Sequence, residues 1–144
     1  MEILNRKARF EYNILREYVA GIQLLGTEVR SLRDGRASIS EGFVFETNGE
    51  LFLRGVRIDR IPSSPNEHTE LRDRKLLLNK KEIRSISRDC TERGVTCVPL
   101  KAFDSRGKIK VIIATARGKK LYDKRETIRE RDIKKQTLRD VKNS

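Results

Sequence analysis

The sequence is poor in the side chains that most catalytic and metal sites use. It has one histidine, two cysteines and no tryptophan among 144 residues. Cys90 and Cys97 do not form a C-x-x-C pair, and His68 lies in the polar stretch PSSPNEH, where we expect it to be exposed. There is also no glycine-rich phosphate loop, H-x-x-x-H motif or nucleophile elbow. We therefore predict no catalytic residue, no metal and no cofactor.

Long hydrophobic runs are missing as well. No apolar stretch approaches the ~20 residues that a membrane-spanning helix needs. The first residues, MEILNRKARF, lack the apolar segment and the small-residue cleavage site of a signal peptide. We therefore expect a cytoplasmic protein with reduced cysteines and no membrane partner.

Positive charge is what the sequence has in excess. It holds 33 Lys and Arg residues against 21 Asp and Glu, which gives a formal net charge of +12. Such a chain attracts polyanions, and the binding should weaken steeply with salt. Charge alone leaves nucleic acid, an anionic membrane surface and an acidic protein open as partners.

The bases gather in three clusters, NRKAR (5–9), RDRKLLLNKKEIR (72–84) and RGKKLYDKR (117–125). Spread along the chain in this way, they favour a broad footprint on phosphates over one recognition helix in a groove. Two interpretations of residues 72–84 stay open. The leucine triplet is a buried strand flanked by solvated charge, or it is a hydrophobic edge beside a basic rim that touches RNA.

Local signals predict a mainly β domain. FVFETNGELFLRG (43–55) is typical of a hairpin with a type I′ turn at Asn48-Gly49. Two more strands, VTCVPLKAF and GKIKVIIATA, are joined through residues 104–107, with Pro99 at an edge or a bulge. A strand over 21–29, a helical turn ending near Asp34-Gly35, and a helix over 79–94 capped by Asn79 and Glu82 complete the prediction.

The tail, residues 117–144, differs from the rest. It carries eleven Lys or Arg residues against five Asp or Glu, and its large apolar residues form no helical stripe. Alone, it should be poorly ordered, whereas a partner could order it. We therefore divide the chain into a mainly β domain over 1–116, which is either a barrel or a sheet with helical caps, and a basic tail over 117–144. The resemblance described next makes the first of these an RNA-binding β-barrel domain.

Several segments together resemble small protein B, the bacterial family that binds SsrA, or transfer-messenger RNA, in trans-translation. They run in the family's order and cover most of the chain: NRKARFEY (5–12), AGIQLLGTEVRSLRDGRA (20–37), RKLLLNKKEI (74–83), VPLK (98–101) and ARGKKLYDKRE (116–126). The resemblance implies an OB-fold-like closed β-barrel of about six strands with two to three flanking helices. It also implies a non-catalytic adaptor whose tail is disordered when free and helical in the mRNA channel of a stalled ribosome.

The resemblance also implies site residues and partners. Val19 stands where the family commonly has a glutamate, and Glu17 is the nearest replacement. The implied partners are the tRNA-like domain of transfer-messenger RNA and the stalled 70S ribosome, together with elongation factor Tu and alanyl-tRNA synthetase through the charged RNA. The residues implied to bind RNA are Asn5, Arg6, Lys7, Arg9, Glu28, Leu77, Lys110, Lys119 and Lys120, and those implied to act at the decoding centre and in the mRNA channel are Tyr122, Asp123, Lys124 and Arg125.

Two other functions remain compatible with a basic RNA-binding chain. One is an RNA-processing nuclease, whose catalytic carboxylates would leave no pattern in the sequence. The other is a structural protein bound permanently to ribosomal RNA.

Overall fold

The computed structural model describes residues 1–61 and 69–119. The polar loop predicted around 62–68 and most of the predicted tail lie outside the described residues. Within them the chain is mainly β, with three helices, as the sequence predicts. The elements are β1 (Glu2–Leu4), α1 (Arg6–Glu11), β2 (Tyr12–Ile22), α2 (Gly26–Arg33), β3 (Ala37–Ser38), β4 (Phe43–Thr47), β5 (Glu50–Arg54), β6 (Arg57–Ile58), β7 (Arg74–Leu77), α3 (Lys80–Asp89), β8 (Val95–Ser105) and β9 (Lys108–Gly118).

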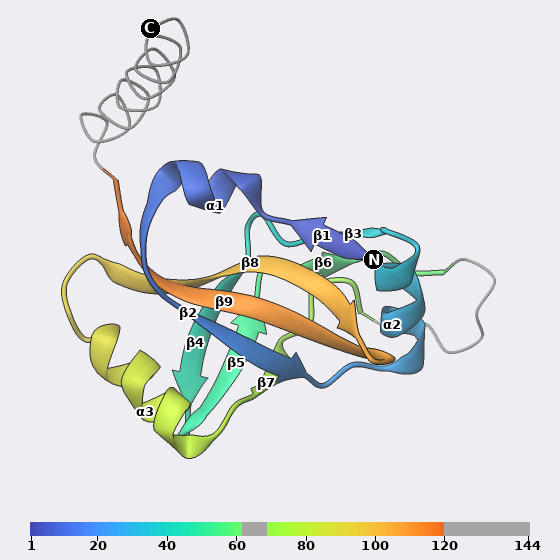
Figure 1. Ribbon diagram of the computed structural model, residues 1–144. Helices are drawn as coiled ribbons and strands as arrows, with labels where there is room; N and C mark the ends of the chain where they lie inside the picture. The colour runs from blue at the N-terminus through green and yellow to red at the C-terminus, as the bar shows by residue number, and fades with distance from the viewer. Residues whose placement is uncertain (62–68, 120–144) are drawn as a thin grey trace, which may run out of the picture.

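Six strands close into a ring of hydrogen bonds, which confirms the predicted strand number. Their order is β8-β4-β5-β7-β2-β9, and β9 pairs back onto β8. All six contacts are antiparallel, and β1 adds a further strand to β8 outside the ring. Figure 1 shows the three helices around this ring, with α1 above the strands, α3 at the lower left and α2 at the right. A closed ring leaves few unpaired strand edges.

Both predicted hairpins form. At the β4–β5 turn, Asn48 and Gly49 have φ values of 53° and 76°, which is the backbone that a type I′ turn requires. The β8–β9 turn repeats this pattern at Arg106 and Gly107, with φ values of 51° and 80°. The pairing of β8 with β9 shifts register between Pro99 and Lys101, so the bulge expected at the proline is present.

Helix α3 begins as predicted and ends earlier. The Asn79 side chain accepts a hydrogen bond from the Glu82 amide at 2.8 Å, and the Glu82 carboxylate accepts one from the Asn79 amide at 3.3 Å. The helix stops at Asp89, not near Gly94, because residues 91–94 form turns that lead into β8. Ile86 is buried and Ile83 and Cys90 pack partly against the core, which is the predicted apolar face.

The prediction for residues 21–29 is wrong. The strand there ends at Ile22, and α2 begins at Gly26, because the Glu28 carboxylate accepts a hydrogen bond from the Leu25 amide at 2.8 Å and starts the helix. The end predicted near Asp34-Gly35 is confirmed, with Gly35 at φ 74°. Apolar side chains fill the inside of the ring, and a second small cluster packs under α1 around Ala8.

Candidate nucleic-acid interface

Leu77, Gly21 and Lys110 lie side by side on three neighbouring strands. Gly21 of β2 is paired with Leu77 of β7 on one side and with Lys110 of β9 on the other. All three line a cavity of about 280 Å³, whose remaining walls come from α2, the β2–α2 connection and the β8–β9 turn. The structure thus brings together two residues, Leu77 and Lys110, that are 33 positions apart in the sequence and that were both predicted to bind RNA.

Each of the three contributes a different property to this surface. The Leu77 side chain is 46% exposed, although it follows the buried Leu76. A side chain at Gly21 would place its Cβ 3.2 Å from the Leu77 Cβ and 3.5 Å from the Leu77 Cδ1, so the glycine makes room for the Leu77 side chain. Lys110 takes part in no ion pair within the described residues, and Lys108 adds a second exposed amine nearby. The result is an apolar contact flanked by cations.

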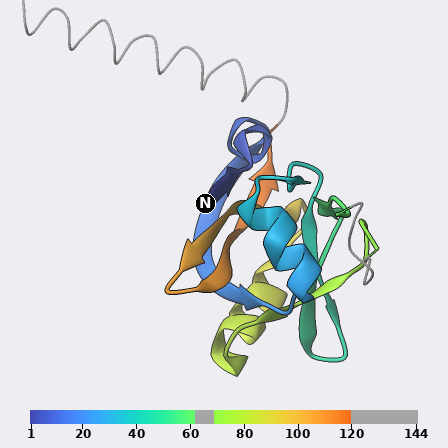
Figure 2. The same cartoon turned by 90° about the vertical axis from the view of Figure 1, so that its right-hand side faces the viewer.

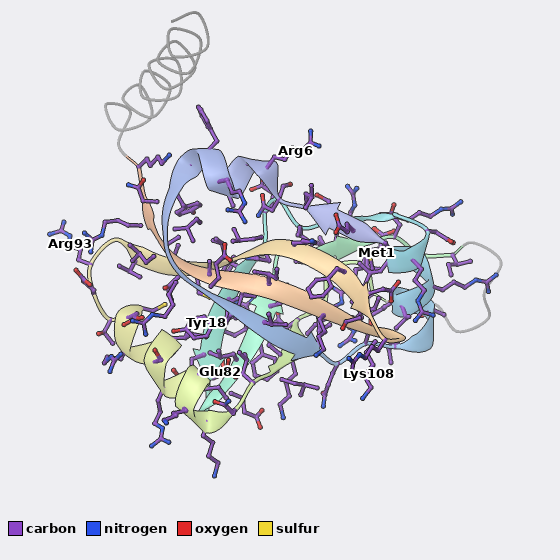
Figure 3. The ribbon with its side chains drawn as sticks, viewed as in Figure 1. Met1, Arg6, Tyr18, Glu82, Arg93 and Lys108 are labelled. Atoms are coloured by element: carbon purple, nitrogen blue, oxygen red, sulfur yellow. The ribbon has the colours of Figure 1, made fainter. Side chains whose placement is uncertain are left out.

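The N-terminal motif lies elsewhere. Figure 3 shows Arg6 pointing outward from α1 and Lys108 far from it, at the β8–β9 turn. Lys7 pairs with Glu41 at 2.6 Å, which raises the pKa of Lys7, and Arg9 pairs with Glu17 at 3.3 Å. Glu17 and Val19 both lie on the exposed side of β2, as expected, but Arg9 already engages the carboxylate. Arg6, Lys7 and Arg9 therefore form a separate cationic surface.

Asn5 lies inside the protein, where it holds α1 in place. Its amide group donates hydrogen bonds to the Pro99 carbonyl at 2.8 Å and to the Ile39 carbonyl at 3.3 Å. Its side-chain oxygen accepts one from the Ala8 amide at 3.1 Å and caps the helix. With only 2% of its surface exposed, this position does not support the direct RNA contact predicted for Asn5.

Glu28 is also buried, between two arginines. Its carboxylate accepts a hydrogen bond from Arg74 Nε at 2.6 Å and further bonds from the Arg72 guanidinium. Burial alone would raise the pKa of Glu28, but the bonds from Arg72, Leu25 and Arg74 outweigh it and hold the pKa below its usual value. A carboxylate with no exposed surface positions its neighbours, so the direct RNA contact predicted for Glu28 is not supported by this location.

Sequence reasoning did not single out Arg74, which is fully buried. Besides Glu28, its guanidinium donates to the carbonyls of Val56, Arg72, Thr69 and Glu70. The signal was present in the alternation of β7, because Arg74 is two residues before the buried Leu76 and so shares its inward face. This buried cluster joins α2, whose Val29 forms one wall of the cavity, to β7, whose Leu77 forms another.

The remaining predicted residues belong to the end of the chain. Lys119 directly follows β9, and its amide donates a hydrogen bond to the Glu11 carbonyl at 2.8 Å. Lys120 and the decoding-centre residues Tyr122, Asp123, Lys124 and Arg125 lie outside the described residues.

Features of other site classes are few. Over residues 1–61 and 69–119, no three His, Cys, Asp or Glu side chains gather as a metal site would require. Cys90 and Cys97 are free thiols, and burial raises the pKa of Cys97. None of the described helices is long and apolar enough to span a membrane.

Comparison with known proteins identifies the family of this chain. The profile of the SmpB protein family matches residues 2–143. The chain belongs to the SmpB family. It is 47% identical to the SsrA-binding protein of Ligilactobacillus salivarius over 140 residues, covering 96% of this chain and 90% of that protein. It is 49% identical to the SsrA-binding protein of Chlorobaculum tepidum, covering 93% and 87%.

A solved structure of an SmpB-family protein supports the same placement. That structure, described as "tmRNA-SmpB: a journey to the center of the bacterial ribosome", superimposes with a TM-score of 0.72 at 41% identity. The match covers 89% of this chain and 94% of that chain. The fold and the family assignment therefore agree.

Proposed function

We propose that this protein binds the tRNA-like part of transfer-messenger RNA and delivers it to the A site of stalled ribosomes, without catalysing a reaction itself. The row formed by Leu77, Gly21 and Lys110 carries the proposal. It belongs to a chain of the SmpB family, whose relatives are named SsrA-binding proteins and whose solved structural neighbour is described as tmRNA–SmpB at the bacterial ribosome.

The two kinds of side chain in the row divide the work of RNA recognition. Lys110 and Lys108 supply phosphate contacts, which provide affinity without sequence preference. Leu77 supplies an apolar surface for the sugar or base face of a nucleotide, and the absent side chain of Gly21 leaves room for the Leu77 side chain beside it. A folded RNA that fits both features binds more tightly than one that meets the charge alone.

A second cationic surface around α1 suits the ribosome. Arg6, Lys7 and Arg9 belong to α1, which leads into the first residue of β2, whereas Gly21 is near the far end of β2. An RNA on the Leu77–Gly21–Lys110 row therefore leaves these three cations available to a second anionic surface. We place ribosomal RNA there. Elongation factor Tu and alanyl-tRNA synthetase belong to the same proposal as proteins that act on the charged transfer-messenger RNA.

The tail completes the proposal. Tyr122 stacks on a base of the decoding centre, and Asp123, Lys124 and Arg125 act in the empty mRNA channel. The ring of strands ends with β9 at Gly118, two residues beyond the domain boundary at 116. Binding of the RNA and probing of the channel are therefore assigned to different parts of the chain.

A competition titration tests this function. Labelled tRNA-like RNA is titrated with the protein at several salt concentrations, with bulk tRNA as competitor. We expect the tRNA-like RNA to remain preferred at physiological salt, because shape and apolar contacts do not weaken as phosphate contacts do. Equal binding of both RNAs would refute the proposal, and metal-dependent cleavage of the RNA would favour a nuclease.

A further inference from the structure

A row of three phenylalanine rings covers the outer face of the β4–β5 hairpin. Phe43 and Phe45 lie on β4, and Phe52 of β5 is the register partner of Phe45. The ring centroids of Phe45 and Phe52 are 5.8 Å apart in a stacked pair, and those of Phe43 and Phe45 are 6.3 Å apart. The intervening side chains on the inward face, Val44, Leu51 and Leu53, are buried in the core.

This aromatic row is not needed to fill the interior. Its rings touch one another on the outside of the sheet, and Phe43 is 40% exposed. In Figure 2 the hairpin lies on the opposite side of the molecule from the β8–β9 turn, and none of the three described helices lies beyond it. Aromatic surface left exposed in a small domain costs free energy, so such a row indicates a binding surface.

Cations are held in fixed places beside the rings. The Arg54 guanidinium carbon lies 4.2 Å from the centroid of Phe45, and Asp73 accepts hydrogen bonds from its Nε and Nη2 at 2.9 Å. Its Nη1 takes no part in this pair. Lys75, the register partner of Phe52, pairs with Glu50 at 3.1 Å. Asp73 and Glu50 are thus each engaged by a cation, which lowers their repulsion of a phosphate.

The aromatic row continues into the surface assigned to RNA. Lys75 and Leu77 are two residues apart on β7, so both point to the outer face of the sheet. Leu77 is next to Gly21, and Gly21 is next to Lys110. One outer face therefore runs from the phenylalanines through Lys75 and Leu77 to Lys110, and an RNA bound at one end has a path to the other.

We propose that Phe43, Phe45 and Phe52, with Arg54 and Lys75, bind unpaired nucleotides of the RNA that occupies the Leu77–Gly21–Lys110 row. Bases stack on exposed aromatic rings, and Arg54 and Lys75 contact the phosphates between them. This inference rests on the proposed function and extends it, since it assigns a stacking surface for single-stranded RNA to a hairpin outside that row.

A double variant tests the proposal in the full chain. Phe43→Thr together with Phe52→Thr removes two rings. The threonines that replace them are β-branched and therefore also favour strands. Leu15→Ser, which removes a 53% exposed apolar side chain from β2, is the matched control. Binding is measured to a single-stranded oligoadenylate, to full-length transfer-messenger RNA and to the compact tRNA-like fragment, after thermal melting has compared the stability of each variant.

We expect the double variant to bind oligoadenylate and the full-length RNA about tenfold more weakly, which is the effect of losing one stacked base. Its affinity for the compact fragment should match that of the Leu15→Ser control. Unchanged oligoadenylate binding by the double variant would overturn the proposal. Failure of the unaltered protein to prefer the tRNA-like fragment would instead overturn the proposed function.

A second measurement avoids the question of folding. Amide resonances of the unaltered protein are followed during titration with the oligoadenylate. The proposal expects the largest shifts over residues 43–54 and 74–77. Shifts confined to α1, or the absence of shifts over 43–54, would overturn it.

Discussion

At the scale of single residues, Asn5 and Glu28 match positions to which the family resemblance assigns RNA contacts, but both side chains are buried inside the protein. Asn5 and Glu28 make their hydrogen bonds to the protein itself, to carbonyls around α1 and to two arginines next to α2. A change at either residue would weaken RNA binding through the position of its neighbours. The sequence pattern indicates that a residue is important for RNA binding. It does not show whether the residue contacts the RNA or holds neighbouring residues in place.

Glu28→Gln tests this supporting role. Removing the carboxylate leaves the buried Arg74 without its charge partner, which should cost about 3 kcal/mol of unfolding free energy. Because the pKa of Glu28 is lowered in the fold, its contribution is complete above the usual glutamate pKa and is lost as the pH falls through the folded value. Urea unfolding of protein and variant should therefore converge at acidic pH. A difference in unfolding free energy between protein and variant that stays constant from neutral to acidic pH would contradict the supporting role of Glu28.

Lys110→Gln tests a direct phosphate contact. We expect weaker binding to all RNAs alike, and a slope of log affinity against log salt that is reduced in size by about one. Arg93→Gln is the control, because Figure 3 places Arg93 beyond α3, far from Lys108. An equal change of slope in both variants would show that Lys110 contributes only to the net charge.

At the scale of elements, the sequence predicted those turns and helix ends whose signal lies within a few consecutive residues. The turns at Asn48-Gly49 and Arg106-Gly107 and the cap at Asn79 need only their own side chains and backbone. The strand β2 was missed because a register shift between Ile14 and Arg16 breaks its alternation of exposed and buried residues. The start of α2 was missed because its N-cap residue is Leu25, which is unusual at that position. Helix α1 was missed because it is only six residues long.

The candidate site could be predicted only in part for the same reason. Leu77 and Lys110 were assigned from resemblance, but their meeting across Gly21 depends on strand pairing between distant segments. Pairing of this kind is decided by tertiary packing, which periodicity does not show. The row of phenylalanines needed both the hairpin register and the outward direction of its rings to become visible.

Gly21→Val tests the row as a unit. The new Cβ would lie 3.2 Å from the Leu77 Cβ, so β7 and β2 must move apart by a few tenths of an ångström. We expect about tenfold weaker binding of the tRNA-like RNA, equal to ~1.4 kcal/mol, by fluorescence titration. Gly26→Ala is the control, because nothing lies within 4 Å of its added Cβ. Equal affinities for the two variants would separate the glycine from RNA recognition.

At the scale of the whole molecule, the account divides the protein into two parts. In the proposed function, the closed ring of strands presents the Leu77–Gly21–Lys110 row to a folded RNA, and residues 117–144 are assigned to the ribosome. Half of the net charge of +12 comes from the tail. Long-range attraction to ribosomal RNA and specific binding of the tRNA-like RNA should therefore respond differently to salt and to truncation.

One titration tests this division most directly. Labelled tRNA-like RNA at physiological salt is titrated with the full chain, with a chain ending at Lys120, and with full-length Lys110→Glu. We predict that the shortened chain binds nearly as tightly as the full chain, whereas Lys110→Glu binds at least about tenfold more weakly. Loss of RNA binding in the shortened chain, with binding kept by Lys110→Glu, would contradict this division.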